Sequence, residues 1–244
     1  MNKKLQRSLK GHKSLLFMDF EGTQYSHEMI AIGAILVHID PKSGRIKKKK
    51  DPFKIYVKAH NKIGAFVTNL TGISEQKLKD EGVSFDVAMK SLKKYCGLYF
   101  KKLTFITFGN HDMRILNQSI MYNIKYPGEI TSQIQKNYFD FAAFLNEFVR
   151  DDKENALSLV HACELFHVKE AGDAHDPEVD AINLANLYDA FLVNTNLVAD
   201  QYKRHLQRSS GTLPDPVTVV INKLSSGQTV TAHDYEEFIR KSLS

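Results

Sequence analysis

Runs of apolar residues along the chain predict five strands. Residues 15–20 (LLFMDF) and 28–40 (EMIAIGAILVHID) are apolar and rich in β-branched side chains, and residues 53–59 (FKIYVKA) alternate apolar with polar positions. The short loop before residue 53, PKSGRIKKKKD, predicts that the second and third strands pair as a hairpin. Residues 103–109 (LTFITFG) and 137–141 (NYFDF) predict the fourth and fifth strands.

Apolar residues at helical spacing predict helices between and after these strands. The clearest helix is SFDVAMKSLKKYCG, residues 84–97, which Gly97 would end. Ser74 is expected to cap a shorter helix before it, although Lys77 stands where a capping box has Glu or Gln. Further helices are predicted in HDMRILNQSIMYNI, ALSLVHACELFHV and DPEVDAINLANLYDAFLV. This order predicts an α/β fold with a five-stranded mixed sheet flanked by helices.

The composition suggests one main domain with two extensions. Residues 1–13 form a basic N-terminal extension, and residues 14–200 the main domain. The C-terminal extension, residues 201–244, begins with a Ser-, Gly- and Pro-containing linker. Within it VTVVI predicts a strand and HDYEEFIRKSL a helix, and we expect the extension to pack on the main domain.

Charge and cysteine content narrow the possible partners. Lys and Arg number 33 against 28 Asp and Glu, which gives a net charge of +5 that is compatible with nucleic acid as a partner. The basic run from Arg45 to Lys50 is expected to be a solvated turn, or alternatively a rim that contacts phosphates. No stretch is apolar enough to predict a membrane helix or a secretory signal, so we expect a cytoplasmic protein. Cys96 and Cys163 lack metal-site spacing and are expected to be buried thiols.

Two acids end the first predicted strand. Asp19 and Glu21 are two residues apart, so their side chains share one face of the strand. Open α/β sheets bind ligands at the carboxyl ends of such strands. Two carboxylates held together there would repel each other unless a divalent cation lies between them. The alternative is that the strand has ended and both acids point into water.

Two further acids and a histidine stand at predicted helix starts. Asp112 opens a helix after a turn at Gly109 and Asn110, a position that the helix dipole alone would favour. Asp176 is a natural N-cap and Pro177 suits the first helical position, which puts Asp180 one turn inside the last long helix. His175 precedes this helix in a loop, free to lean over the group that Asp180 points at. The residues upstream, Gly172 and Asp173, are typical of a mobile loop.

The order of these residues, Asp-x-Glu, then Asp, then His-x4-Asp, resembles that of the DEDDh 3′–5′ exonucleases, which include ribonuclease T, oligoribonuclease and polymerase proofreading subunits. The likeness runs from about Ser14 to Leu192, and TFGNHD is most similar to the small members related to the histone-mRNA exonucleases. The resemblance implies a three-layer ribonuclease H-like fold. It implies that two Mg²⁺ or Mn²⁺ ions are held by four acids and that His175 is the general base: Asp19, Glu21, Asp112 and Asp180 are the ligands.

The resemblance also implies a substrate and its contacts. The substrate would be RNA or single-stranded DNA with a free 3′ end, shortened by one nucleoside 5′-monophosphate at a time. Gly22, Thr23, Phe66 and Asn110 lie where the terminal nucleotide is expected, and Phe66 could stack on its base. Leu70 could also contact the base, but a core position is the better interpretation. The chain departs from the family in having DPEV between His175 and Asp180, where Glu178 adds a negative charge.

Three alternatives remain from the sequence. His-Asp pairs at 111–112, 175–176 and 233–234 are also found in all-helical metal phosphohydrolases, which the predicted strands disfavour. The same fold could serve as a nucleic-acid-binding or docking module without activity. The chain could also act as a homodimer or as the proofreading partner of a polymerase.

Overall fold

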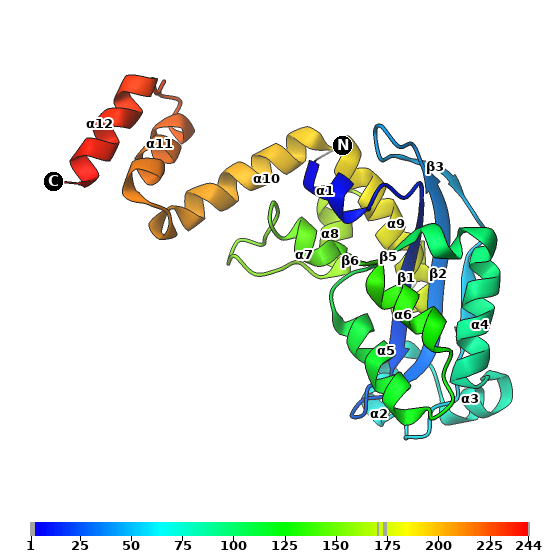
Figure 1. The fold of residues 1–244 in the computed structure, drawn as a ribbon. Coiled ribbons are helices and arrows are strands. Elements are labelled where there is room, and N and C mark those ends of the chain that lie inside the picture. The colour runs from blue at the N-terminus through cyan, green and yellow to red at the C-terminus, as the bar shows by residue number, and fades with distance from the viewer. Residues whose placement is uncertain (1–2, 170, 173–174, 244) are drawn as a thin grey trace. The chain divides into compact units, whose positions relative to one another are not determined.

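A computed structural model describes residues 3–169, 171–172 and 175–243. The chain divides into two compact units (Figure 1). Unit 1 comprises Met1–Phe144 and Ser158–Val193, and unit 2 comprises Leu145–Leu157 and Asn194–Ser244. All of the candidate site residues belong to unit 1. The domain boundaries expected from the sequence, and the packing of the C-terminal extension on the main domain, stay predictions.

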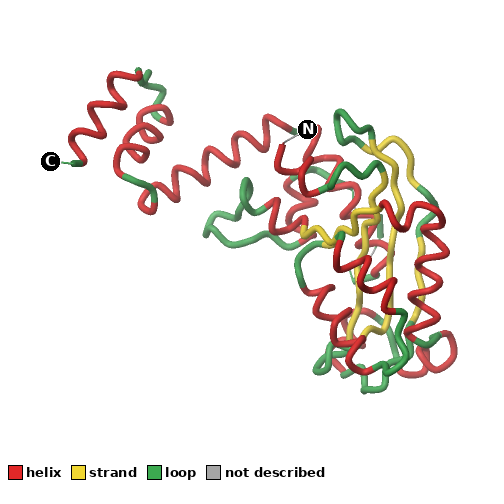
Figure 2. Tube along the Cα trace, viewed as in Figure 1, coloured by secondary structure: helices red, strands yellow, loops and turns green. Residues whose placement is uncertain are grey.

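One mixed sheet forms the centre of unit 1 (Figure 2). Over the described residues it has six strands, in the order β3-β2-β1-β5-β6, with β4 also paired to β2. Strand β1 is antiparallel to β2 and parallel to β5, and β5 is parallel to β6. The strands are β1 (Ser14–Gly22), β2 (Met29–Ile39), β3 (Ile46–Lys49), β4 (Phe53–Tyr56), β5 (Leu103–Thr107) and β6 (Tyr138–Asp140).

The prediction of five strands was wrong by one, because the basic run is a strand and not a turn. Ile46–Lys49 forms β3, which pairs antiparallel with the last residues of β2. Strand β2 is eleven residues long, so its outer edge offers backbone groups that both β3 and β4 use. The lysines of β3 are exposed, whereas the guanidinium of Arg45 pairs with Asp189 at 2.8 Å. The predicted pairing of the second strand with residues 53–59 is confirmed.

Helices cover both faces of the sheet, which makes β1 apolar on both sides. On one face Leu16, Met18 and Phe20 pack in a core cluster with residues of α4, α5 and α6. On the other face the ring of Phe17 lies 5.3 Å from that of Tyr188, which belongs to α9. The helices are α4 (Phe85–Cys96), α5 (His111–Tyr122), α6 (Gly128–Lys136) and α9 (Pro177–Val193). The odd-numbered residues of β1 therefore face α9.

The remaining elements of unit 1 agree with the predicted helix signals. Ser74 Oγ accepts the N–H of Lys77 and caps α3, and Gly97 ends α4, as predicted. Both cysteines are buried thiols, as expected, and the two form no disulfide with each other. These elements are α1 (Lys3–Ser8), α2 (Ala65–Thr71), α3 (Glu75–Glu81), η1 (Gly97–Lys102), α7 (Phe141–Leu145), which extends one residue into unit 2, and α8 (Leu159–Leu165).

Unit 2 is helical over its described residues. It contains α10 (Thr195–Arg208), η2 (Ser209–Thr212), α11 (Asp215–Ser225) and α12 (Ala232–Ser242). The strand predicted for VTVVI was wrong, because these residues lie in α11. The β-branched run has no strand to pair with, and Asp215-Pro216 starts a helix. The predicted terminal helix is confirmed as α12. No helix within the described residues is long and apolar enough to span a membrane.

Candidate active site

Strand β1 delivers two carboxylates to the face that α9 covers. Asp19 and Glu21 follow Phe17 at alternate positions, so all three side chains lie on this face. Both acids are half-buried, at the end of a strand whose first five residues are buried. The prediction that the two acids project together beyond an apolar strand agrees with this arrangement.

A glycine in the neighbouring strand lets α9 reach these acids. Gly33 of β2 lies opposite Asp19 in the sheet register. A Cβ atom at Gly33 would lie 1.9 Å from the carbonyl carbon and oxygen of Pro177 and 2.3 Å from the nitrogen of Glu178. Any other residue at position 33 would push the first turn of α9 off the sheet. The sequence carried this signal, since glycine inside a strand often marks a close backbone approach.

The start of α5 holds Asp112 against β1. The carboxylate of Asp112, which is 5% exposed, accepts the N–H of Phe20 at 2.7 Å. The turn before α5 is fixed by β6, because the N–H of Gly109 donates to Asp140 and the hydroxyl of Tyr138 donates to the carbonyl of Gly109. Gly109 has φ +107°, which favours glycine, so the predicted turn is confirmed.

The loop before α9 brings His175 to the same place. The N–H of His175 donates to Asp180 Oδ2 at 3.0 Å, and the residue has φ +66°. Ligand atoms of Glu21, His175 and Asp180 all lie within 4.8 Å of one another. His175 is exposed and therefore reachable from solvent. Asp173, also expected in this loop, lies outside the described residues.

The four acids interact strongly because they are close together. Burial raises the pKa of Asp19 well above its usual range, and the charges of Asp112, Glu21 and Asp180 raise it further. Burial and the charges of Asp180 and Asp112 raise the pKa of Glu21 to about 8. Burial raises the pKa of Asp112 to about 7, although the N–H of Phe20 opposes this. Such a cluster must take up protons or bind cations. Clustered carboxylate oxygens fit hard divalent cations such as Mg²⁺ or Mn²⁺.

A lysine that the sequence did not single out anchors the start of α9. Lys54 of β4 lies beside Gly33 in the register, and its ammonium donates to Asp176 Oδ2. The other oxygen of Asp176 accepts the N–H of Glu178 at 3.0 Å, so Asp176 caps the helix as predicted. Asp19, Gly33 and Lys54 thus form one row across three strands beneath the first turn of α9. Nothing in the local pattern around Lys54 signals this contact.

The four predicted substrate residues differ in how accessible they are. Phe66 is 63% exposed at the start of α2, and its N–H donates to Gln24 Oε1 at 3.3 Å. Asn110 is exposed at the N-cap of α5. Thr23 is buried, and its hydroxyl accepts the N–H of Glu28 at 2.9 Å. Gly22 packs close to the side chain of Ile115.

Leu70 does not occupy the core position that the sequence favoured, since its side chain is 41% exposed. Buried Glu28 is a structural residue that the sequence did not reveal. Its carboxylate accepts the N–H groups of His60 and Asn61 and so ties the loop after β4 to the loop after β1. Gln24 belongs to the loop after β1, and its side-chain oxygen accepts the N–H of Phe66.

The comparison with protein families identifies the family of the chain. The model of the RNase_T family, described as an exonuclease family, matches residues 16–188. The chain belongs to this exonuclease family. The resemblance to the DEDDh exonucleases inferred from the sequence is therefore confirmed. The six-stranded sheet excludes the all-helical metal phosphohydrolases. No curated protein matches the chain.

Solved structures of exonucleases share the fold. The nuclease domain of 3′hExo, a DEDDh family member bound to rAMP, is 21% identical with a TM-score of 0.60, over 75% of this chain and 93% of that domain. A full-length 3′-exonuclease is 20% identical with a TM-score of 0.59, and the match covers 75% of this chain and 62% of the other. Exonuclease I of E. coli in complex with a dA16 oligonucleotide is 16% identical with a TM-score of 0.55, over 82% and 44%. The expected ribonuclease H-like fold is confirmed, with a sixth strand.

The pair of Lys54 and Asp176 gives a first prediction. Lys54→Met should lower the free energy of unfolding by about 1 kcal/mol, since both partners are partly exposed and the contact is screened. Lys54→Met combined with Asp176→Asn should recover part of this loss, because no unpaired carboxylate remains beside the acids. Urea unfolding of the wild type, Lys54→Met, Asp176→Asn and the double variant measures the coupling. Losses of unfolding free energy that add exactly in the double variant would contradict the role given to Lys54. Lys58→Met, at an exposed lysine, serves as the matched control for Lys54→Met.

The raised pKa of Glu21 gives a second prediction. At about pH 7 the unfolded chain has released this proton while the folded protein largely retains it, so stability falls as the pH rises towards 8. His12, His27 and His111 have lowered pKa values and act in the opposite direction, but only below about pH 7. In EDTA the melting temperature should therefore drop between about pH 7 and about pH 8.

Divalent cations should reverse this loss, because they replace the protons that the acids release. Mn²⁺ should raise the melting temperature more at about pH 8 than at about pH 7. Glu21→Gln should flatten the dependence on pH in EDTA. A melting temperature in EDTA that rises over this interval would refute the electrostatic description of the site.

Proposed function

We propose that the chain is a metal-dependent 3′–5′ exonuclease that removes nucleoside 5′-monophosphates from the 3′ end of RNA or single-stranded DNA. The observation that carries this proposal is the convergence of acids from three distant segments beside one loop histidine. Structures of similar fold are described as bound to rAMP and to a dA16 oligonucleotide, which supports a nucleic acid substrate.

The proposed cofactors are two divalent cations, Mg²⁺ or Mn²⁺. Asp19, Glu21, Asp112 and Asp180 would hold them, since Asp19 interacts with each of the other three acids. A pair of bound cations stabilises the charge on the attacking and leaving oxygens of a phosphodiester displacement. The acids would therefore bind and position the cations, and other groups would transfer the protons.

His175 is the proposed general base. Its exposed side chain lies beside Glu21 and Asp180, so it can accept the proton of a water molecule that attacks the last phosphodiester. Its hydrogen bond to Asp180 fixes the backbone at the start of α9, which limits where the imidazole can lie.

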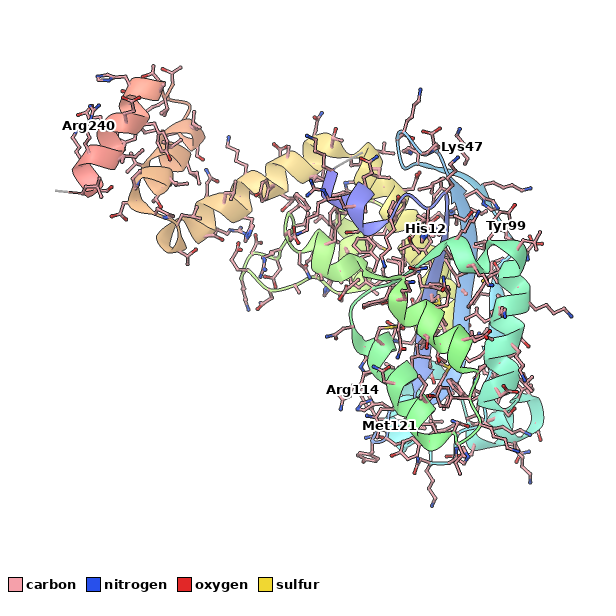
Figure 3. The ribbon with its side chains drawn as sticks, in the orientation of Figure 1. His12, Lys47, Tyr99, Arg114, Met121 and Arg240 are labelled. Carbon is pink, nitrogen blue, oxygen red and sulfur yellow. The ribbon has the colours of Figure 1, made fainter. Side chains whose placement is uncertain are left out.

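The terminal nucleotide is proposed to lie over the end of β1. The exposed ring of Phe66 can stack on its base, and the backbone of Gly22 and Thr23 can contact its sugar. Asn110 borders the same place from the start of α5. Arg114, whose exposed side chain is labelled in Figure 3, lies on the same helix. The homodimer, the polymerase partner and the cytoplasmic location stay predictions from the sequence.

A module that only binds nucleic acid is the weaker candidate. A chain that had lost activity would not need four acids whose mutual repulsion destabilises the metal-free protein. All four are present, and Lys54 and Gly33 keep the start of α9 beside them.

Activity measurements test the proposal. Purified protein with Mn²⁺ should shorten 5′-labelled RNA or single-stranded DNA stepwise from the 3′ end, and EDTA should stop the reaction. His175→Ala should lower turnover by roughly 10² to 10⁴-fold, the range for a lost general base, while Mn²⁺ affinity falls much less.

Asp112→Ala should abolish turnover, since the variant loses a ligand held at the centre of the cluster. His161→Ala, at an exposed histidine of α8, is the matched control for His175→Ala and should keep full activity. Full activity of Asp112→Ala, or products that arise from internal cleavage, would refute the proposed function.

A further inference from the structure

Two neighbouring hollows lie between α4 and α6, on the face of the sheet opposite α9. Their volumes are about 510 and 520 Å³, and they share Lys93 and Glu129 in their linings. We call the pair the α4–α6 lysine groove, because five lysines line it: Lys90, Lys93, Lys94, Lys101 and Lys136. Figure 1 shows α4 and α6 side by side on this face.

Most of the positive charge in this groove is not neutralised by the protein. Lys90 pairs with Asp86 at 2.7 Å. Within the part of the chain that the structure describes, the other four lysines form no ion pair. Glu129 is the one acid among the described lining residues. Four unpaired ammonium groups around one carboxylate therefore form a surface that attracts a polyanion.

The helix dipole accounts for single lysines at helix ends, but it does not account for the grouping of these lysines around one groove. Lys93 and Lys94 lie in the last turn of α4, and Lys136 in the last turn of α6, where the helix dipole weakly favours cations. Lys101 lies in the last turn of the separate helix η1. Three helix ends converge on one concave surface, so the repulsion among their lysines offsets that small gain.

An aromatic ring borders the lysines. Tyr126 is 44% exposed, and its ring lies against Gly128, which lines the groove. Lysines that track a phosphate backbone beside an exposed ring that can stack on a base are the combination found in sites for single-stranded nucleic acid. The apolar residue Phe100, by contrast, is buried and serves the core.

We propose that the α4–α6 lysine groove binds the sugar–phosphate backbone of a nucleic acid strand, at a site separate from the acids. The class of ligand rests on the proposed function, whereas the site itself rests on the groove. Since Asp19 and Glu21 face α9 and the groove lies on the other face, only a strand long enough to pass around the sheet can occupy both. The groove therefore increases affinity for long substrates and leaves very short ones unaffected.

Binding without cleavage tests the proposal. The groove variant carries Lys93→Gln, Lys101→Gln and Lys136→Gln. The matched control carries Lys42→Gln, Lys79→Gln and Lys153→Gln, which removes the same charge from exposed lysines outside the groove. Fluorescence anisotropy in EDTA measures the binding of 5′-labelled oligouridylate of about 20 and about 4 nucleotides across a range of salt concentrations.

For the 20-mer, the groove variant should bind at least about tenfold more weakly at low salt. The slope of log affinity against log salt should become shallower by about 2, since each phosphate contact to a single strand contributes about 0.7. Binding of the 4-mer should be unchanged, and the control should match the wild type. Equal losses in control and groove variant, an unchanged 20-mer, or a 4-mer weakened as much as the 20-mer would each overturn the proposal.

The same samples keep this proposal distinct from the proposed function. Wild-type protein that binds the 20-mer through the groove but never shortens it in Mn²⁺ would refute the exonuclease proposal alone. Shortening with no effect of the lysines would refute the groove alone. If the triple variant unfolds, Lys101→Gln by itself should still lower the slope by about 0.7, and no change in that variant counts against the groove.

Discussion

The first turn of α9 lies directly on β2 at Gly33, and the candidate site depends on this contact. The backbone of Pro177 occupies the space that a side chain at position 33 would need. Because Gly33 is opposite Asp19, the same contact sets Asp180 and His175 beside the acids of β1. Lys54, one strand further along the row, holds Asp176 and so keeps the helix start in place. A single row of the sheet thus determines the positions of residues from three distant segments.

This arrangement is unfavourable in the absence of cations, and the protein offsets only part of the cost. The N–H of Phe20 stabilises one oxygen of Asp112, and Lys54 neutralises Asp176 at the margin of the cluster. Burial, together with the charges of Asp180 and Asp112, still raises the pKa of Glu21 to about 8, so the folded state bears part of this cost. Divalent cations that bind these acids in the folded state would therefore stabilise it.

The candidate site residues that the sequence singled out lie close together in the fold, whereas some of the elements around them were predicted wrongly. Asp19, Glu21 and Asp112 were singled out because strand period and helix-start chemistry are local signals, and residue order linked them. The β3 strand was missed because its formation depends on pairing with the edge of β2, which is not a local signal. Helix α11 was missed because its β-branched residues are typical of a strand, although the preceding Asp215-Pro216 is a helix start. Lys54 was missed for the same kind of reason, since its partner Asp176 lies far along the chain. The buried hydroxyl of Thr23 likewise depends on a loop closed by Glu28.

Calorimetric titration with Mn²⁺ of the wild type and of Gly33→Ala tests the central claim most directly, with circular dichroism to confirm that both proteins are folded. The wild type should bind two ions per chain. Gly33→Ala should keep its secondary structure but bind Mn²⁺ at least about tenfold more weakly, or at one site only, because the added methyl group displaces Asp180. A wild type that binds no Mn²⁺, or a Gly33→Ala variant that binds it as the wild type does, would contradict the account.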